Sequence, residues 1–218
     1  MKTSELFSGN HTIAKDLIEK YDCPWQILAH VKDFIWELGK KLDTGCFEER
    51  THGVWIAKNA RISDSAYIGA PAIIDDGAEV RHCAFIRGSV IIGKDCVVGN
   101  STEMKNSIIF DGVQVPHYNY VGDSILGYRA HLGAGAITSN VKSDKSTVAI
   151  IENGKRIDTG LKKLGAIIGD MVEVGCNSVL CPGTIIGKGA TVYPLSRVRG
   201  TVERDSIFKN EENIVKKQ

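Results

Sequence analysis

A six-residue repeat runs through most of this chain. Every sixth residue from Ile56 is apolar for ten consecutive samples, and the same period returns for six samples from Ile168. The sampled residues are Ile56, Ile62, Ile68, Ile74, Val80, Ile86, Ile92, Val98, Met104 and Phe110, and then Ile168, Val174, Leu180, Ile186, Val192 and Val198. Because only 43% of the chain is apolar, these sixteen apolar residues in register are not a chance run.

A period of six fits neither the 3.6-residue period of a helix nor the alternation of a half-buried strand. It is typical of a solenoid in which each hexapeptide forms one short strand and a corner, and three strands close a triangular coil. A small or apolar residue recurs four positions after each sample, as at Ala60, Ala66 and Ala72, and suits a tight corner. Burial of each Ile contributes about 1.5–3 kcal/mol, so a column of stacked Ile and Val can hold the fold. We therefore expect an all-β fold, a parallel β-helix of hexapeptide repeats.

Composition and charge exclude several classes of partner. The formal net charge is +1, without the basic excess of a nucleic-acid-binding protein, and the apolar runs are too short to span a membrane. The start MKTSELFSGN lacks the apolar core of a signal peptide, so a cytoplasmic protein is expected.

No CxxC pair exists, and Cys96 occupies a small, inward repeat position, so reduced structural thiols are expected. The six cysteines are Cys23, Cys46, Cys83, Cys96, Cys176 and Cys181.

The two ends of the chain depart from the repeat. Residues 1–52 read as an N-terminal helical cap, in which Pro24 opens an apolar helical stretch that runs to Leu42 after a shorter helix. Because a solenoid must cover its first coil, we expect this segment to cap that edge, with a partner-binding module as the alternative. Residues 53–205 are the expected β-helix domain, and the polar tail 206–218 is expected to be frayed or briefly helical.

An insertion interrupts the repeat at about residues 141–164. Its stretch STVAIIENGKRIDTG has two β-prone runs around Asn153-Gly154, which is the strongest short signal for a β-hairpin. The second run begins with Lys155 and Arg156. Such a hairpin is either decoration or one wall of a site, and the sequence favours neither interpretation.

The repeat slips near the middle of the chain. After Phe110 it reads FDGVQV and PHYNYV, then only the four residues GDSI, before LGYRAH and LGAGAI restore it. Pro116 stands where a large apolar residue is expected, and His117 follows it. Locally unfavourable choices are expected mainly at functional sites, so this stretch is the candidate site.

An ordered set of short motifs surrounds the slip. The motifs are Arg-Gly at Arg87, Glu-x-Lys-Asn from Glu103, His-x-x-Tyr-x-Gly-Asp from His117 and Gly-Ala-Gly from Gly133. In this order they resemble the acetyltransferase domain of the bifunctional UDP-N-acetylglucosamine pyrophosphorylase/glucosamine-1-phosphate N-acetyltransferases (GlmU), over roughly residues 55–205. The stretch NGKRIDTGLKKLGAIIGD also resembles archaeal sugar-phosphate nucleotidyltransferases. The resemblance implies a left-handed parallel β-helix, a homotrimer, and acetyl-CoA as co-substrate.

The same resemblance implies roles for individual residues. It places the catalytic base at His117. The implied sugar-phosphate contacts are Arg87, Glu103, Lys105, Tyr120 and Asn140, with Lys145 as the nearest candidate for a further lysine. The implied acetyl-CoA contacts are His131, Gly133, Ala134 and Cys176. The bacterial enzymes carry an Asn at the position of His131.

The chemistry of these residue types agrees with N-acetylation of an amino-sugar 1-phosphate. A base must take a proton from the amine as it attacks the thioester, and His suits this role because its pKa of about 6.5 lies near working pH. Arg87, Lys105 and Lys145 would complement the phosphate, and one such pair at ~4 Å is worth ~4 kcal/mol at an effective dielectric constant of ~20, before desolvation. Gly133-Ala134-Gly135 lets the pantetheine arm approach the backbone, whose N–H groups can donate to the developing oxyanion.

The spacing of the charged residues predicts how the site is assembled. Arg87 and Lys105 lie eighteen residues apart, which is one coil, so they should stack on one face about 4.8 Å apart. His117 follows Lys105 by twelve residues and is expected on another face. We therefore expect the site to be assembled across a subunit interface.

A zinc site is the first alternative to acetyl transfer. Hexapeptide carbonic anhydrases hold zinc with three His, and His82 and His117 resemble two of them. The third falls at Val121-Gly122 in this chain, and His131 is a poor substitute, so no metal is expected.

A non-catalytic β-helix, which binds a nucleotide sugar or scaffolds a partner, is the second alternative. His131 and the expected lack of a nucleotidyltransferase domain favour it, whereas the complete set of Arg87, Lys105, His117 and Tyr120 argues against it. Nucleotidyl transfer is not expected, because the first fifty residues are too short and too helical for the Gly-rich nucleotide loop of the bifunctional relatives.

Overall fold

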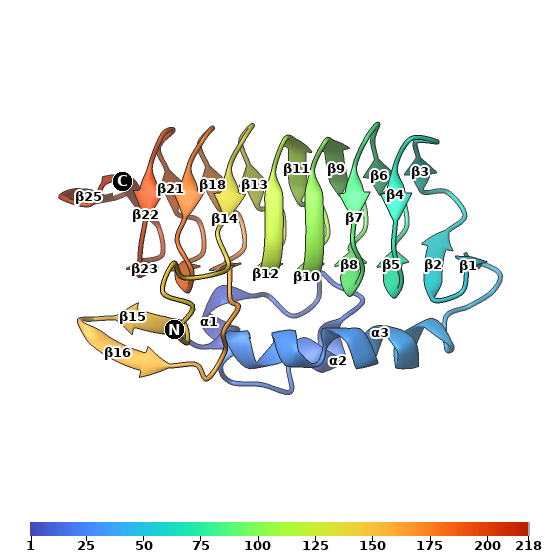
Figure 1. The fold of residues 1–218 in the computed structure, drawn as a ribbon, viewed down its shortest axis with the longest axis horizontal. Helices are drawn as coiled ribbons and strands as arrows, with labels where there is room; N and C mark the ends of the chain where they lie inside the picture. Colours follow the sequence, from blue (N-terminus) through green and yellow to red (C-terminus); the bar gives the residue numbers. More distant parts are fainter. Residues whose placement is uncertain (218) are drawn as a thin grey trace.

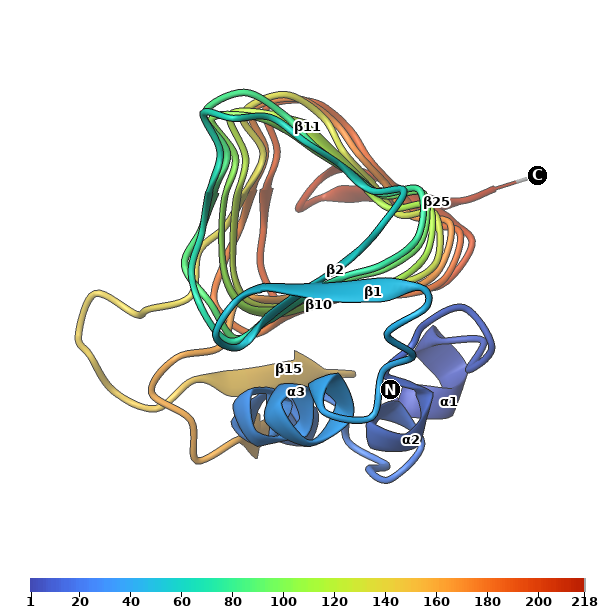
Figure 2. The same cartoon turned by 90° about the vertical axis from the view of Figure 1, so that its right-hand side faces the viewer.

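The computed structural model describes residues 1–217 and forms a triangular β-solenoid (Figures 1 and 2). Strands of successive coils pair in parallel, with partners 18 residues apart in regular coils and 17 in shortened ones. Figure 2 looks along the solenoid from its N-terminal end. The chain passes from the lower face to the right-hand face and then to the left-hand face as it recedes, so the solenoid is left-handed. The predicted left-handed β-helix is confirmed.

Three faces, numbered in chain order from β3, enclose the core. The first face contains β3 (Arg61–Ile62), β6 (Glu79–Val80), β9 (Val97–Asn100), β11 (Gln114–His117), β13 (His131–Leu132), β18 (Glu173–Val174), β21 (Thr191–Val192) and β24 (Ser206–Asn210). The second contains β4 (Tyr67–Ile68), β7 (Phe85–Ile86), the first halves of β10 (Glu103–Ile109) and β12 (Tyr120–Leu126), β14 (Ile137–Thr138), β19 (Val179–Leu180) and β22 (Arg197–Val198). The third contains β2 (Val54–Ala57), β5 (Ala72–Ile74), β8 (Val90–Ile92), the second halves of β10 and β12, β17 (Ala166–Ile168), β20 (Thr184–Ile186) and β23 (Thr201–Val202).

The interior is a stacked column of apolar side chains contributed by all three faces. Ile74, Ile86 and Val98 come from three different faces and are fully buried in one cluster. Cys96 is completely buried in the same cluster, as its repeat position predicts. The hexapeptide period therefore identifies the residues that hold the fold together.

The expected phase of the repeat is wrong at Phe110. The inward residue is Ile109, only five residues after Met104. Phe110 instead faces outward and packs on Phe7, with ring centroids 5.0 Å apart. The slip thus begins one strand earlier than the sequence interpretation placed it.

Two shortened coils account for the slip. Asn106 and Asp123 lie within the two five-residue steps and have φ angles of 43° and 48°. Asn and Asp tolerate this left-handed conformation better than other residues with a side chain. The core position before Pro116 is filled by the fully buried Val115. Pro116 therefore replaces no core residue, and that interpretation is wrong.

The N-terminal helices lie along the third face, below the solenoid in Figures 1 and 2. They are α1 (Thr3–Leu6), α2 (Lys15–Ile18), the 3₁₀ helix η1 (Pro24–Ala29) and α3 (Val31–Gly39). None of the helices in residues 1–217 is long and apolar enough to cross a membrane.

The third face accepts these helices because its strands are apolar on both sides. One outward side chain per coil joins a second core cluster with the helices and the insertion: Ile73, Ile91, Ile108, Ile125, Ile167 and Ile185. The helices thus cover a side of the solenoid, and the predicted cap over the first coil is wrong. That coil is instead bordered by β1 (Phe47–Thr51), which pairs antiparallel with β2.

The insertion contains the predicted hairpin. β15 (Ala149–Glu152) and β16 (Lys155–Asp158) pair antiparallel, and Asn153 and Gly154 both have positive φ in the turn between them. The C-terminal tail is also a hairpin, in which β24 pairs with β25 (Asn213–Lys216) and buries Phe208. The expectation of a frayed or helical tail is wrong.

Candidate active site

Most of the predicted site residues, with the exception of His131 and Lys145, gather on the second face and at its two edges. At the edge shared with the first face is the His117 corner, formed by His117, Ala134 and Cys176. At the edge shared with the third face is the Asp123 corner, formed by Asn106, Asp123 and Asn140. The residues between these corners are Arg87, Glu103, Lys105 and Tyr120.

The His117 corner is built by strand pairing. β11 ends at His117, and its pairing with β13 places Ala134 beside it in the next coil, where the N–H of Gly135 donates to the His117 carbonyl at 3.0 Å. The pairing of β13 with β18 then places Cys176 beside Ala134. His117 is exposed, so its imidazole is accessible to a substrate amine.

Asn119 ties the turn after His117 to the next coil. Its side chain is buried, and its Nδ2 donates to the carbonyls of Gly133 at 2.8 Å and Ala136 at 3.2 Å. Its Oδ1 accepts the backbone N–H of His117 at 3.1 Å. Asn119 therefore fixes His117 relative to the Gly-Ala-Gly stretch, a role that the sequence interpretation missed.

Gly133 is required by the close approach of two coils. A Cβ at this position would lie 2.7 Å from the backbone nitrogen of Cys176 and 3.0 Å from its sulfur. The predicted proximity of Gly133, Ala134 and Cys176 is therefore present in the structure. His131 lies apart from them on the first face, where its Nδ1 is 2.8 Å from a carboxylate oxygen of Glu173.

The Asp123 corner is a column of polar side chains at 17-residue intervals. Asp123 is buried, and Nδ2 of Asn106 donates to its Oδ1 at 2.9 Å. Nζ of Lys105 lies 3.1 Å from Oδ2, which also accepts from Nδ2 of Asn140. The side chains of Asp123 and Lys105 are only 5% and 19% exposed, so this is a largely desolvated ion pair.

Tyr120 links the Asp123 corner to the second face. Its hydroxyl oxygen accepts from Nδ2 of Asn140 at 3.2 Å. Burial raises the pKa of Tyr120, so the phenol stays protonated and can donate to a ligand oxygen. Tyr120 and Asn140 are thus brought together with Lys105, as the resemblance implies.

Arg87 stacks beside Lys105 one coil away, as the eighteen-residue spacing predicts. Phe85 and Ile86 pair with Glu103 and Met104, so the next pair along these strands is Arg87 and Lys105. Nη1 of Arg87 lies 2.8 Å from Oε1 of Glu103, and this hydrogen bond raises the pKa of Arg87. Two cations therefore lie in one column.

Lys145 is not brought to this cluster. It is exposed in the loop that leaves the solenoid after Asn140, and it has a positive φ of 56°. Within residues 1–217, no group of three or more His, Cys, Asp or Glu side chains is arranged to hold a metal ion. The candidate site described here therefore comprises His117, Arg87, Lys105 and the Asp123 corner.

Asp123 and Asn106 close two of the quoted motifs, but the sequence interpretation assigned them no role in the candidate site. A signal was present, because Asn106, Asp123 and Asn140 recur every 17 residues. That column is visible only when the coils are known to be shortened by one residue. With a strict period of six, these residues fall on different repeat positions.

Comparisons with known proteins agree with this description. Residues 68–157 match the GMPPB C-terminal domain family. The chain is 34% identical, over 85% of its length and 47% of the relative's, to a bifunctional sugar-1-phosphate nucleotidylyltransferase/acetyltransferase of Sulfurisphaera tokodaii. It is 33% identical, over 89% of its length and 48% of the relative's, to the bifunctional protein GlmU of Methanococcus vannielii. The chain thus spans about half the length of these curated relatives.

Among solved structures, the polySia-specific acetyltransferase NeuO is similar with a TM-score of 0.49 and 16% identity, over 72% of this chain and 80% of that one. The sequence identity to the two bifunctional proteins is higher, 33–34%, and extends over 85–89% of this chain. The chain is therefore an acetyltransferase-like left-handed β-helix related to the acetyltransferase domain of the bifunctional sugar-1-phosphate nucleotidylyltransferase/acetyltransferases.

Proposed function

We propose that the protein transfers the acetyl group of acetyl-CoA to the amine of an amino-sugar 1-phosphate, such as glucosamine 1-phosphate. The observation that carries the proposal is the arrangement on one face. An exposed His117 beside a corner of small residues flanks a column in which Arg87 and Lys105 stack. The histidine and its small neighbours suit acyl transfer, and the two stacked cations suit the binding of a phosphate.

The proposed reaction uses His117 as general base. The neutral sugar amine attacks the thioester carbonyl carbon, a C–N bond forms, and the C–S bond breaks. His117 takes the proton that the amine loses and returns it to the departing coenzyme A thiolate. Asn119 positions His117 through its backbone, and Gly133 keeps the neighbouring corner narrow enough for Cys176 to lie against it.

The phosphate end of the acceptor is proposed to lie on Arg87 and Lys105. Arg87 offers several N–H donors, of which Glu103 engages one, and its side chain is 46% exposed. Asp123 holds the Lys105 ammonium in place, since both are largely buried. Tyr120 and Asn140 would then meet sugar hydroxyl groups beside the phosphate.

The complete site is proposed to form between subunits of a homotrimer. His117 and the Asp123 corner lie on opposite edges of the second face. Exposed apolar side chains, which favour contact with another protein surface, occur on the second face and at the His117 corner. They are Tyr67, Phe85, Tyr118, Ile137, Val179 and Leu195. A neighbouring subunit packed here would bury them and bring its own catalytic edge to the phosphate column.

Release of coenzyme A thiol tests the proposed activity. Wild-type protein is incubated with acetyl-CoA and a panel of amino-sugar phosphates, with a no-acceptor blank because Cys46, Cys83 and Cys176 are exposed thiols. We expect His117→Ala to lower turnover roughly 10²–10⁴-fold. His82→Ala is the matched control, because His82 is also exposed and lies on the same edge of the solenoid, two coils earlier. Near-wild-type turnover of His117→Ala would contradict the assignment.

Subunit mixing tests the proposed assembly. Arg87→Ala and His117→Ala proteins are each expected to be inactive. Mixed oligomers should regain activity, because at some interfaces a subunit with an intact Arg87 meets a subunit with an intact His117. Mixed oligomers that remain inactive after verified subunit exchange would place the whole site in one chain.

Sugar-nucleotide binding without any thiol release would favour the non-catalytic alternative. UDP-sugar formation from UTP would contradict the expectation that these residues transfer no nucleotide.

A further inference from the structure

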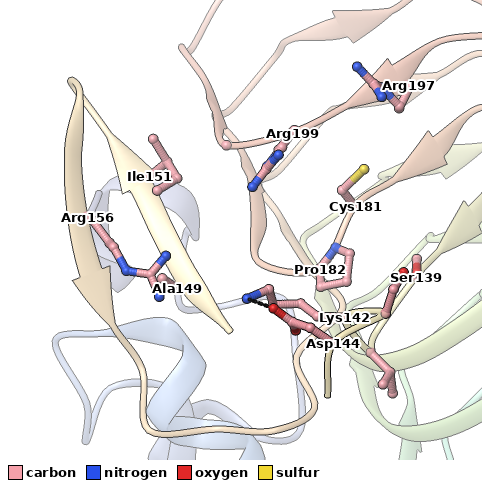
Figure 3. A pocket seen from close by; sticks show the side chains of 13 residues that line it. Ser139, Lys142, Asp144, Ala149, Ile151, Arg156, Cys181, Pro182, Arg197 and Arg199 are labelled. Carbon is pink, nitrogen blue, oxygen red and sulfur yellow. Dashed lines mark ion pairs between the residues drawn. The ribbon is translucent and has the colours of Figure 1, made fainter. Parts of the chain in front are cut away.

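A cavity lies between the inserted hairpin and the last coils, and its lining includes Ser139 and Val141, the chain neighbours of Asn140 in the Asp123 corner (Figure 3). Its volume is about 440 Å³, within the range of small-molecule sites of roughly 300–1,000 Å³. Ile151 and Arg156 line it from the hairpin, and Ser139, Cys181 and Arg199 line it from the solenoid. The insertion is therefore one wall of a cavity.

The hairpin wall is held firmly against the solenoid. Val148 and Ile150 are fully buried in the same cluster as Ile167 and Ile185 of the third face. Oγ1 of Thr201 also donates to the carbonyl of Ile151 at 2.8 Å. The cavity is thus preformed, so a ligand would not have to order the hairpin before binding.

The cavity is lined by more positive than negative side chains: Lys142, Arg156, Arg197 and Arg199 against Asp144. Arg197 is paired with Glu211 at 2.7 Å, and Lys142 with Asp144 at 3.3 Å. Arg156 and Arg199 make no ion pair with any residue in 1–217. Both arginines line the cavity, and Figure 3 shows Arg199 extending toward the hairpin and Arg156 lying on the hairpin near Ala149.

The surrounding segment is also basic. Residues 141–164 contain six Lys or Arg and three Asp or Glu, an excess of three positive charges, whereas the whole chain carries only +1. Two guanidinium groups that face one cavity match the oxygen geometry of phosphates, which they bind through paired hydrogen bonds. The cavity is therefore suited to a ligand with more than one phosphate group.

A second, apolar hollow of about 400 Å³ continues from this cavity and shares Ile151, Arg199 and Gly200 with it. Val202, Phe208 and Ile214 line the hollow, and so does Glu211, whose carboxylate is paired with Arg197. An aromatic base favours such a surface, while its phosphates favour the arginines. We propose that the two hollows together bind a nucleoside 5′-diphosphate group, with the base against the apolar part and the phosphates between Arg156 and Arg199.

Arg199 lies at the far end of the column of residues that begins at Lys105 of the proposed active site. Strand pairing carries that column from Lys105 through Gly122, Ser139 and Cys181 to Arg199. Four coil steps of about 4.8 Å give a separation of ~19 Å, so one phosphate cannot contact both ends. Two sources carry the proposed group, the nucleotide end of coenzyme A and a nucleotide sugar. The site does not depend on the proposed acetyl transfer.

Calorimetric titration of the whole chain with UDP, coenzyme A and inorganic pyrophosphate tests the site. Arg156→Gln/Arg199→Gln is expected to weaken nucleotide binding by roughly tenfold or more per guanidinium removed. Lys162→Gln/Lys163→Gln is the matched control, because it removes two charges from the same segment outside the cavity lining. This control should bind within about twofold of wild type, since distant exposed charges are screened by salt.

The outcomes separate the two sources of the ligand. UDP binding that coenzyme A does not displace indicates a nucleotide sugar, and mutual displacement indicates that the coenzyme also uses the site. Equal weakening in both double variants, absence of UDP and coenzyme A binding, or pyrophosphate binding as tight as UDP would overturn the proposal. If the double variant misfolds, arginine modification of wild type decides the question: UDP should protect Arg156 and Arg199 but not Arg204.

Discussion

Asp123→Asn should destabilise the protein through its ion pair with Lys105. The substitution keeps the backbone suitable, because Asn tolerates the positive φ of 48° at this position. It removes the negative charge that lies 3.1 Å from the Lys105 ammonium. It also leaves one amide oxygen where Lys105, Asn106 and Asn140 now donate to two carboxylate oxygens.

The expected cost follows from the burial of the pair. Removing one partner of a buried ion pair costs about 3–5 kcal/mol, because the other charge stays desolvated. Lys105 retains 19% exposure and can be partly hydrated, so we expect the lower end, about 3 kcal/mol. Lys105→Met should be destabilising as well. The double variant should cost less than the sum of the single variants by about 1 kcal/mol or more.

Urea unfolding at one fixed protein concentration, followed by circular dichroism, measures these costs. The matched control is the Lys142–Asp144 pair, whose side chains are 27% and 64% exposed and whose coupling should stay below about 1 kcal/mol. If the costs of Asp123→Asn and Lys105→Met add within about 0.5 kcal/mol, the pair is not coupled in the folded state and the reasoning is refuted.

Three further substitutions test the fold. Burial raises the pKa of the Asp75 carboxyl in the folded protein above its value in the unfolded chain. The stability that this group contributes is therefore present in acid and is lost as pH rises through the folded pKa. Asp75→Asn should therefore melt at a higher temperature than wild type near pH 7, with the difference disappearing in acid; an equal difference at both pH values would contradict this. Gly39→Ala would place a Cβ 2.4 Å from the Trp55 ring and should cost about 1–3 kcal/mol in urea unfolding, unlike Lys40→Ala. Phe110→Ala should cost about 3–5 kcal/mol by removing the contact with Phe7, and a loss below 1 kcal/mol would show that the helices are held elsewhere.

Most of the solenoid could be predicted because its core depends on a local rule. Each strand contributes an inward residue at a fixed interval, as at Ile74, Ile86 and Val98, and a fixed interval is readable from one sequence. The hairpin was equally local, since Asn153 and Gly154 specify their own turn. The position of the N-terminal helices was not readable in this way. It depends on outward Ile residues 17 or more positions apart, which interact with the helices only after the coils have formed.

The site was predicted less completely than the fold, for a related reason. His117, Arg87 and Lys105 stand in motifs to which the resemblance assigns a role. Asp123 closes one of these motifs and Asn119 lies within it, but both act through contacts between coils that the motif does not show. Lys145 was expected beside Asn140 from its place in the chain, yet the loop there turns away from the solenoid. Sequence neighbours of a motif therefore share its site only where the regular coil continues.

The departures from regularity concentrate along one edge of the solenoid. The shortened coils turn at Asn106 and Asp123, and the insertion leaves the solenoid directly after Asn140, at the same edge between the second and third faces. Inward residues such as Val121 and Leu126 remain fully buried on either side of these turns, so the core is continuous beneath them. Since the core does not depend on what this edge carries, polar residues and an inserted hairpin can occupy it at little cost in packing. The same edge therefore carries both the buried Lys105–Asp123 pair and the cavity proposed for a nucleotide.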